Sequence, residues 1–237
     1  SAIAEGLRPF GDPKVTAVAA NVRALNHRRN LLTRLIDMRY ANAFLFERAA
    51  YSTVGSVVCC CGSLSFFRTA VVRRHLDDFL HQSFLGIQVQ YGDDRRLTQY
   101  ALQDGLVRLQ DTAVAYTLVP ETLGHYRRQQ LRWNRSFFRE SLWAIQRFGP
   151  RRWPFWISVA ELAVWMVFTI SLLAAVYVRP VLTGQMIPWS FVAFAVVLAY
   201  ARNVRYFGRP DESLRSLFET FACAQIYTVL HVLLLTP

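Results

Sequence analysis

An amide, a guanidinium and an indole occur at helical spacing in the segment Tyr126–Glu140, as Gln129, Arg132 and Trp133. Positions i, i+3 and i+4 lie on one face of a helix, so these three side chains would point the same way. An indole can stack on a sugar ring, an amide can hydrogen-bond hydroxyl groups, and a guanidinium can bind phosphate oxygens. The spacing therefore suits a sugar with a phosphate, although a basic surface helix with a buried tryptophan would contain the same residues.

Two adjacent carboxylates, Asp93 and Asp94, precede this segment, and Asp94 lies 35 residues before Gln129. They follow Gly92 and begin a predicted helix, Arg95–Gln103. An aspartate at a helix start is usually an N-cap, but both aspartates need not be caps. One carboxylate can therefore be structural while the other acts as a base toward a hydroxyl group.

Together the two motifs resemble those of the processive, membrane-embedded glycosyltransferases of family 2. These include the hyaluronan, chitin, nodulation chitooligosaccharide and cellulose synthases, and the hyaluronan synthases are the most similar. The resemblance covers nearly the whole chain, and its strength lies in the order and spacing of short matches. Besides the two motifs, the matches are Val18–Arg23, Leu32–Asn42, Phe46–Ala50, Cys60–Leu64, Gln82–Gly86, Gly92–Thr98 and Arg202–Tyr206.

The resemblance implies an α/β fold, namely the C-terminal part of a GT-A type nucleotide-sugar transferase domain followed by a transmembrane helix bundle. We expect residues 1–150 to form the partial transferase domain and residues 151–237 the membrane region. The implied reaction is inverting transfer from UDP-sugars, UDP-GlcNAc and UDP-GlcA, to a growing β-linked glycan, coupled to export.

The resemblance also implies roles for individual residues. Asp94 would be the catalytic base, Trp133 would stack on the acceptor sugar, and Gln129 and Arg132 would bind the diphosphate or acceptor hydroxyls. Further substrate-binding residues would be Asp93, Arg95, Cys60, Gly62 and Ser63. The last three belong to a loop that is often C-S-G-P-L in the family. Here Cys61 replaces the serine and Ser63 the proline, and both replacements change the stiffness expected of the loop.

Family members hold Mg²⁺ or Mn²⁺ and the diphosphate with a D-x-D motif, which this chain does not contain. The adjacent pairs Asp77-Asp78 and Asp93-Asp94 do not replace it. We therefore expect the metal ligands to precede Ser1, and we interpret the chain as a fragment that is inactive alone.

Three apolar segments, each long enough to cross a bilayer, are expected at Phe155–Val178, Val181–Ala201 and Phe218–Pro237. Arginines flank one side of them, which places the catalytic domain in the cytoplasm of a multi-pass plasma-membrane protein. Glu161 lies within the first segment, and it is equally consistent with a functional residue and with one that reaches the interface.

Charge is concentrated in residues 1–154, which hold 22 of the 27 Lys and Arg residues and 12 of the 16 acidic residues. A basic domain fits anionic partners. With the resemblance, we expect UDP-sugar donors, a growing glycan and the lipid bilayer, and no nucleic acid. The four cysteines have neither zinc-site nor disulfide-framework spacing, which favours reduced thiols.

The remaining pattern predicts the elements that position the motifs. Strands are expected at Val15–Val22 and Val107–Val119, and a helix over Asn30–Ala50, where Glu47 and Arg48 are interpreted as scaffolding. The uncharged stretch Ser52–Phe67 is expected to be a buried strand with a tight loop. A long helix should begin near Pro120 and end at Gly149-Pro150. Its later part is amphipathic and either lies on a membrane surface or packs into the domain.

Two other functions share these features. A chitin or chitooligosaccharide synthase would use the same catalytic residues with UDP-GlcNAc alone. An inactive membrane scaffold would keep the fold without the chemistry, since half of the expected active site is absent. The sequence upstream of residue 1 would distinguish the scaffold from an enzyme.

Overall fold

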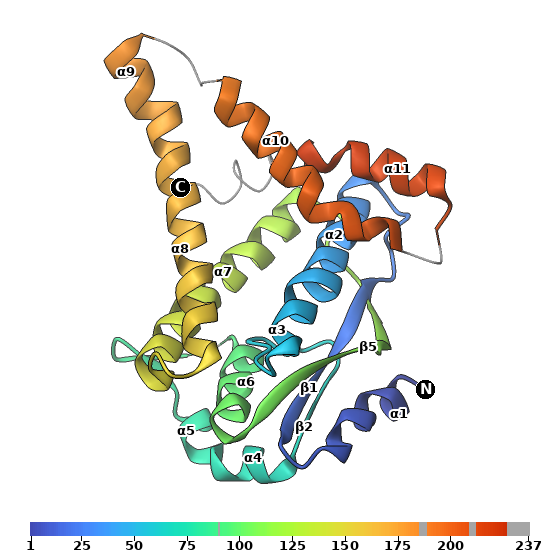
Figure 1. Cartoon of the computed structure of the whole chain (residues 1–237), viewed down its shortest axis with the longest axis vertical. Coiled ribbons are helices and arrows are strands. Elements are labelled where there is room, and N and C mark those ends of the chain that lie inside the picture. Colours follow the sequence, from blue (N-terminus) through green and yellow to red (C-terminus); the bar gives the residue numbers. More distant parts are fainter. Residues whose placement is uncertain (90, 185–188, 209–211, 227–237) are drawn as a thin grey trace.

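The computed structural model describes residues 1–89, 91–184, 189–208 and 212–226. Its N-terminal part is built around a three-stranded sheet of order β2-β1-β5 (Figure 1). Strand β1 (Val15–Ala24) is parallel to β5 (Leu106–Thr117) and antiparallel to the short strand β2 (Ser65–Phe67). A mixed sheet covered largely by helices agrees with the expected α/β class.

Strand β1 is the centre of the sheet because it is apolar on both faces. Every residue of β1 except Arg23 is buried. Such a nearly continuous buried run, in which only Thr16, Asn21 and Arg23 are polar, is typical of a strand that is covered on both sides. Helix α1 (Ala2–Leu7) packs against the sheet, where a side chain at Gly6 would overlap the Phe66 ring.

The predicted helix Asn30–Ala50 is confirmed, but it is not a uniform α-helix. Helix α2 (Leu31–Asn42) continues into a π-helix (Ala43–Arg48) and then into α3 (Ala49–Thr53). A capping box begins it: the Asn30 side chain accepts from Thr33 N at 2.9 Å, and Asn30 N donates to Thr33 Oγ1 at 3.1 Å. Apolar periodicity predicts the helical stretch but does not distinguish a π-turn within it.

The expectation of a buried strand within Ser52–Phe67 is wrong for most of its length. The stretch begins as the end of α3, and only its last residues form strand β2. Between them Ser56 makes a single isolated bridge to Val107. Val57 N donates to the Val107 carbonyl of β5 at 3.3 Å as part of this bridge, and Val57, Val58 and Cys60 are buried in a core cluster with residues of α6 and α7. Their apolar character therefore reflects the core and not a strand.

Helices α4 (Thr69–Arg74) and α5 (Leu76–Leu80) and a small hairpin, β3 (Ser83–Phe84) and β4 (Ile87–Gln88), lead to α6 (Asp93–Asp104). Helix α7 (Leu123–Phe148) follows β5. The Thr122 hydroxyl caps it by accepting from His125 N at 3.3 Å, and Gly149, with φ of 66°, ends it. The predicted limits of this long helix are therefore confirmed.

The C-terminal part contains one helix, α8 (Trp153–Leu173), that is long and apolar enough to cross a membrane within the described residues. A π-helical segment (Ala174–Val178) and α9 (Arg179–Thr183) extend it (Figure 1). The second expected span is divided between α9 and α10 (Trp189–Asn203), and residues 185–188 lie outside the described residues.

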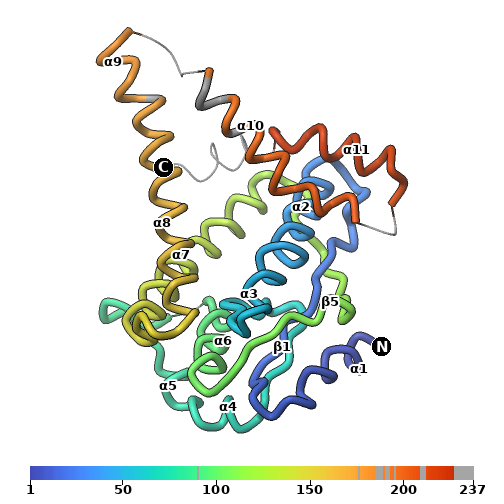
Figure 2. Tube along the Cα trace, viewed as in Figure 1, coloured from blue at the N-terminus to red at the C-terminus, as the bar shows by residue number. Residues whose placement is uncertain are grey.

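The third expected span lies mostly in residues 227–237, outside the described residues. Its beginning belongs to α11 (Leu214–Ala222), which follows a 3₁₀ turn, η4 (Val204–Gly208). Leu217 of α11 and Tyr206 of η4 are buried in a cluster with Leu35 and Met38 of α2. This C-terminal segment therefore packs on the N-terminal part, beside the path of α2 (Figure 2).

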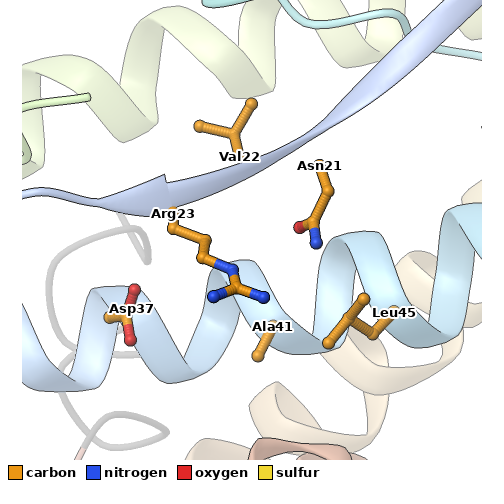
Figure 3. Close-up of a pocket in the computed structure, with 6 residues that line it drawn as sticks. All are labelled: Asn21, Val22, Arg23, Asp37, Ala41 and Leu45. Atoms are coloured by element: carbon orange, nitrogen blue, oxygen red, sulfur yellow. The ribbon is translucent and has the colours of Figure 1, made fainter. Parts of the chain in front are cut away.

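A small cavity of about 10 Å³ lies between β1 and α2 (Figure 3). It is lined by Asn21, Val22, Arg23, Asp37, Ala41 and Leu45. Asp37 is fully buried and its Oδ1 accepts from Ala24 N at 3.0 Å. A space of this size holds about one water molecule, so it is too small for a sugar.

Candidate active site

The Gly92–Asp94 turn is fixed by its contact with α7. Gly92 has φ of 93°, a left-handed conformation that favours glycine, and a Cβ atom there would overlap Ser136 and Arg139. Gly92 itself is the N-cap of α6, so Asp93 and Asp94 both lie in the first turn. Neither aspartate is therefore the N-cap.

Asp94 is half-buried, while Asp93 is exposed. The Asp94 Oδ1 atom accepts a hydrogen bond from Arg95 N at 2.8 Å. Its backbone carbonyl accepts from Thr98 Oγ1 at 2.6 Å, and the same hydroxyl accepts from Cys60 N at 2.9 Å. Thr98, which the sequence analysis missed, therefore joins the Cys60 loop to the Asp94 turn.

The Cys60 loop combines a buried beginning with an exposed end. Cys60 is fully buried, and burial raises the pKa of its thiol, so it is a packing residue at this position. Gly62 and Ser63 are exposed, and a Cβ atom at Gly62 would meet open space. A bulky ligand could therefore approach the loop at Gly62 and Ser63 but not at the Cys60 side chain.

A buried charge cluster holds α6 against α7. Glu140 is fully buried and accepts from Arg96 Nε at 2.6 Å and from Arg139 Nε at 2.7 Å. Arg139 Nη2 also donates to the Tyr91 carbonyl at 2.6 Å, directly before the Gly92 turn. This cluster was not predicted from the sequence. Its signal was an acidic residue, Glu140, within a helix whose other charged side chains are arginines.

The predicted face of α7 is accessible. Trp133 is 41% exposed, which excludes a tryptophan buried between helices, and Arg132 is exposed. Gln129 is half-buried, and its Oε1 has no hydrogen-bond partner within the described part of the chain. One turn after Trp133, the Phe137 ring lies 5.3 Å from the Arg95 guanidinium. The structure thus brings the Asp94 turn close to the Trp133 face.

The sequence pattern of a protein family described as "Glycosyltransferase like family 2" matches residues 1–136. The match covers more than half of the chain, including the sheet, α6 and the Trp133 face. This chain belongs to glycosyltransferase family 2.

Several proteins of named function are similar in sequence to this chain. The chain is 36% identical to a hyaluronan synthase of Streptococcus pyogenes over 245 aligned residues, which are 100% of the chain and 55% of that protein. It is 44% identical to an N-acetylglucosaminyltransferase of Azorhizobium caulinodans over 135 residues, 56% of the chain and 34% of that protein. The protein of the same name from Neorhizobium galegae is 42% identical over the same length. The chain thus spans about half the length of the hyaluronan synthase.

Helix α7 of this family 2 chain lies between α6 and α8. Besides its contacts with α6, it contacts α8 through Phe138, whose ring centroid is 4.5 Å from that of Trp165. The structure therefore supports the interpretation that the later part of α7 packs into the protein, where its buried residues include Ser141, Ala144 and Phe148.

Glu161 of α8 is hydrogen-bonded to the N-terminal part. Its Oε1 atom accepts from the Tyr51 hydroxyl of α3 at 3.0 Å. Burial, followed by the negative charge of Glu161, raises the pKa of Tyr51, so the phenol remains a donor. The contact gives Glu161 a structural partner.

A divalent cation does not fit the residues that the structure describes. No group of three or more His, Cys, Asp or Glu side chains among them is arranged to hold a metal. The Asp93 and Asp94 residues differ in solvent exposure: Asp93 is exposed and Asp94 is half-buried.

Proposed function

We propose that the protein is a membrane polysaccharide synthase of the hyaluronan synthase type. It would transfer sugars from UDP-GlcNAc and UDP-GlcA to the non-reducing end of a growing β-linked glycan. The likeness to a hyaluronan synthase along the whole chain supports this product. The observation that carries the proposal is the position of the exposed Trp133 near the Asp94 turn. Trp133 lies one helical turn from Phe137, and the Phe137 ring contacts the Arg95 guanidinium of that turn.

In this proposal Asp94 is the general base. Its carboxylate takes the proton of the acceptor hydroxyl while the hydroxyl oxygen attacks the anomeric carbon of the donor. The bond from that carbon to the diphosphate breaks, and UDP leaves with the electron pair. A single displacement of this kind inverts the anomeric centre. The Arg95 N–H bond to Oδ1 leaves Oδ2 to receive the proton.

The remaining predicted residues bind the substrates in this proposal. Trp133 stacks on the acceptor sugar, and Gln129 and Arg132 contact acceptor hydroxyls or the diphosphate. The Gln129 Oε1 atom, which has no hydrogen-bond partner among the described residues, is a buried acceptor that a sugar hydroxyl could satisfy. Asp93 and Arg95 lie on the same turn as the base. Gly62 and Ser63 would approach the acceptor, while Cys60 supports them from the core.

The membrane part of the proposal extends from α8. Residues 1–150 would form the cytoplasmic transferase domain and residues 151–237 a multi-span region through which the glycan leaves. The apolar surface of α8 supports one span, because most of its side chains from residue 163 to 173 are exposed. Processivity follows if the acceptor stays bound between additions.

A second candidate is an oligosaccharide synthase that uses UDP-GlcNAc alone. The identity of 44% with an N-acetylglucosaminyltransferase over 135 residues favours it, since this region contains the transferase elements. The two candidates share the Asp94 chemistry and differ in the second donor.

The test is to express the full-length protein in membranes and supply UDP-GlcNAc with and without UDP-GlcA. We expect a high-molecular-weight product only with both donors, and complete digestion of it by hyaluronidase. Product from UDP-GlcNAc alone that chitinase digests would establish the second candidate. If the folded protein transfers neither sugar, the proposal is overturned, and the inactive membrane scaffold is the function that remains.

Trp133→Ala should shorten the polymer before it stops donor turnover. Loss of a stacking surface costs about 1–3 kcal/mol, by analogy with bases stacked on aromatic side chains. Because a processive enzyme holds its polymer between additions, this loss raises the release rate. Trp133→Phe should have a milder effect. Product length by gel electrophoresis is the measurement, and Trp153→Ala, which removes another exposed indole, is the control. Normal-length polymer from Trp133→Ala would contradict the stacking role.

A further inference from the structure

The π-helix Ala43–Arg48 ends in two charged residues whose side chains bind different parts of the protein. Glu47 accepts from Arg202 Nη2, at the end of α10, at 2.7 Å. It also accepts from Arg39 Nη1 at 3.2 Å and from Asn42 Nδ2 at 2.9 Å. This carboxylate therefore joins the transferase part to the C-terminal helices.

The Glu47 carboxylate is ionised under physiological conditions. Burial alone would favour its neutral form, but the charges of Arg39 and Arg202 outweigh burial and lower its pKa to about 2. The contact with Arg202 is thus a hydrogen bond between two charged groups, which is stronger than one between neutral groups.

Arg48, the next residue, contacts Cys59 at the start of the Cys60 loop. Its Nε atom donates to the Cys59 carbonyl at 2.9 Å and its Nη1 atom to the Ala43 carbonyl at 3.1 Å. The guanidinium lies 4.4 Å from the centre of the Phe44 ring, which fixes it in place. The residue after Cys59 is Cys60, whose N–H reaches the Asp94 turn through Thr98.

We propose that Glu47 and Arg48 are positioning residues that couple the end of α10 to the acceptor side of the active site. The path runs from Arg202 to Glu47, through the peptide bond to Arg48, and on to the Cys59–Ser63 loop and Asp94. A π-helix is rare and is frequently found at functional sites, because its wide turn is retained only where it is needed. This inference rests on the proposed function. It assigns to Glu47 and Arg48 the role of linking sugar addition to movement of the product.

Contiguous contacts show coupling only when paired substitutions are non-additive. The test therefore compares Glu47→Gln, Arg202→Gln and the double variant in the full-length enzyme in membranes. Two quantities are measured for each, the sugar incorporated into polymer and the UDP released. Arg205→Gln removes a similarly exposed charge three residues later and is the matched control.

We expect each single variant to lower the ratio of incorporated sugar to released UDP by about 2- to 10-fold, within the range of coupled contacts. The double variant should be no worse than the singles, Arg202→Lys should restore most of the ratio, and Arg205→Gln should leave it unchanged. Arg48→Lys should lower it as well, because the single lysine ammonium lacks the planar fork of two nitrogens, Nε and Nη1, that Arg48 uses for its two carbonyl contacts. Simple destabilisation would reduce both quantities together and keep the ratio.

The outcomes separate this inference from the proposed function. If the wild-type enzyme makes polymer and the variants keep its ratio, the coupling is overturned and the synthase remains. Additive losses in the double variant would also overturn it. If the wild-type protein makes no polymer, both the proposed synthase function and this inference are overturned. If Glu47→Gln fails to fold, the ratios measured for Arg202→Gln and Arg202→Lys test the coupling. The Arg202 side chain is 48% exposed, so we expect these variants to fold.

Discussion

Asp94→Asn in the full-length enzyme should abolish polymer synthesis while the protein still folds and binds UDP. The amide has the same shape as the carboxylate, and its oxygen can still accept from Arg95 N as the Oδ1 atom does at 2.8 Å. It cannot take a proton, and a general base contributes about 10²–10⁴-fold to a rate. Incorporation of labelled sugar per folded molecule is the measurement.

Asp93→Asn is the matched control for this variant. Asp93 is the exposed neighbour in the same helical turn, so the substitution removes an equal charge without removing the base. It should lower incorporation far less than Asp94→Asn. Polymer synthesis within a few-fold of wild type by Asp94→Asn would exclude Asp94 as the base.

Glu140→Gln should destabilise the protein strongly. Glu140 is the shared counter-charge of Arg96 and Arg139, and its side chain is inaccessible to solvent. Removing one partner from a buried ion pair costs about 3–5 kcal/mol, because the remaining charge stays buried and unpaired. The free energy of unfolding, measured by denaturant titration of detergent-solubilised protein, should fall by that amount.

Glu121→Gln provides the comparison. Its carboxylate is 45% exposed and lies 3.7 Å from Arg29 Nε. Exposed ion pairs of this kind contribute about 0–1 kcal/mol. Equal losses in the two variants would show that the Glu140 cluster does not hold α6 to α7.

Local signals predicted the elements that carry the motifs. Thr122 and Gly149 mark the limits of α7, because helix caps depend on residues next to the helix ends. The mostly apolar sequence of β1 indicates a strand that is covered on both faces, because this pattern can be read from consecutive residues. The face formed by Gln129, Arg132 and Trp133 follows from helical spacing alone. The loop-to-helix position of Asp94 was also predictable from the glycine before it.

Features that depend on distant contacts were not predictable in the same way. The need for glycine at position 92 arises from Ser136 and Arg139, which the sequence places more than 40 residues away. The burial of Glu140 was not predictable because Arg96, one of its two arginine partners, lies on α6, 44 residues earlier in the sequence. Hydropathy could not show that Val57–Cys60 fills the core without forming a strand, nor that α11 packs on α2.

The most direct test of the central claim is a structure of the full-length Asp94→Asn enzyme with a UDP-sugar donor and a short glycan acceptor. The account predicts that the terminal acceptor sugar stacks on Trp133. It also predicts that the attacking hydroxyl lies about 2.6–3.2 Å from the residue 94 side chain, the distance required for proton transfer. A terminal sugar bound away from both residues, with its hydroxyl next to another acidic side chain, would contradict the account.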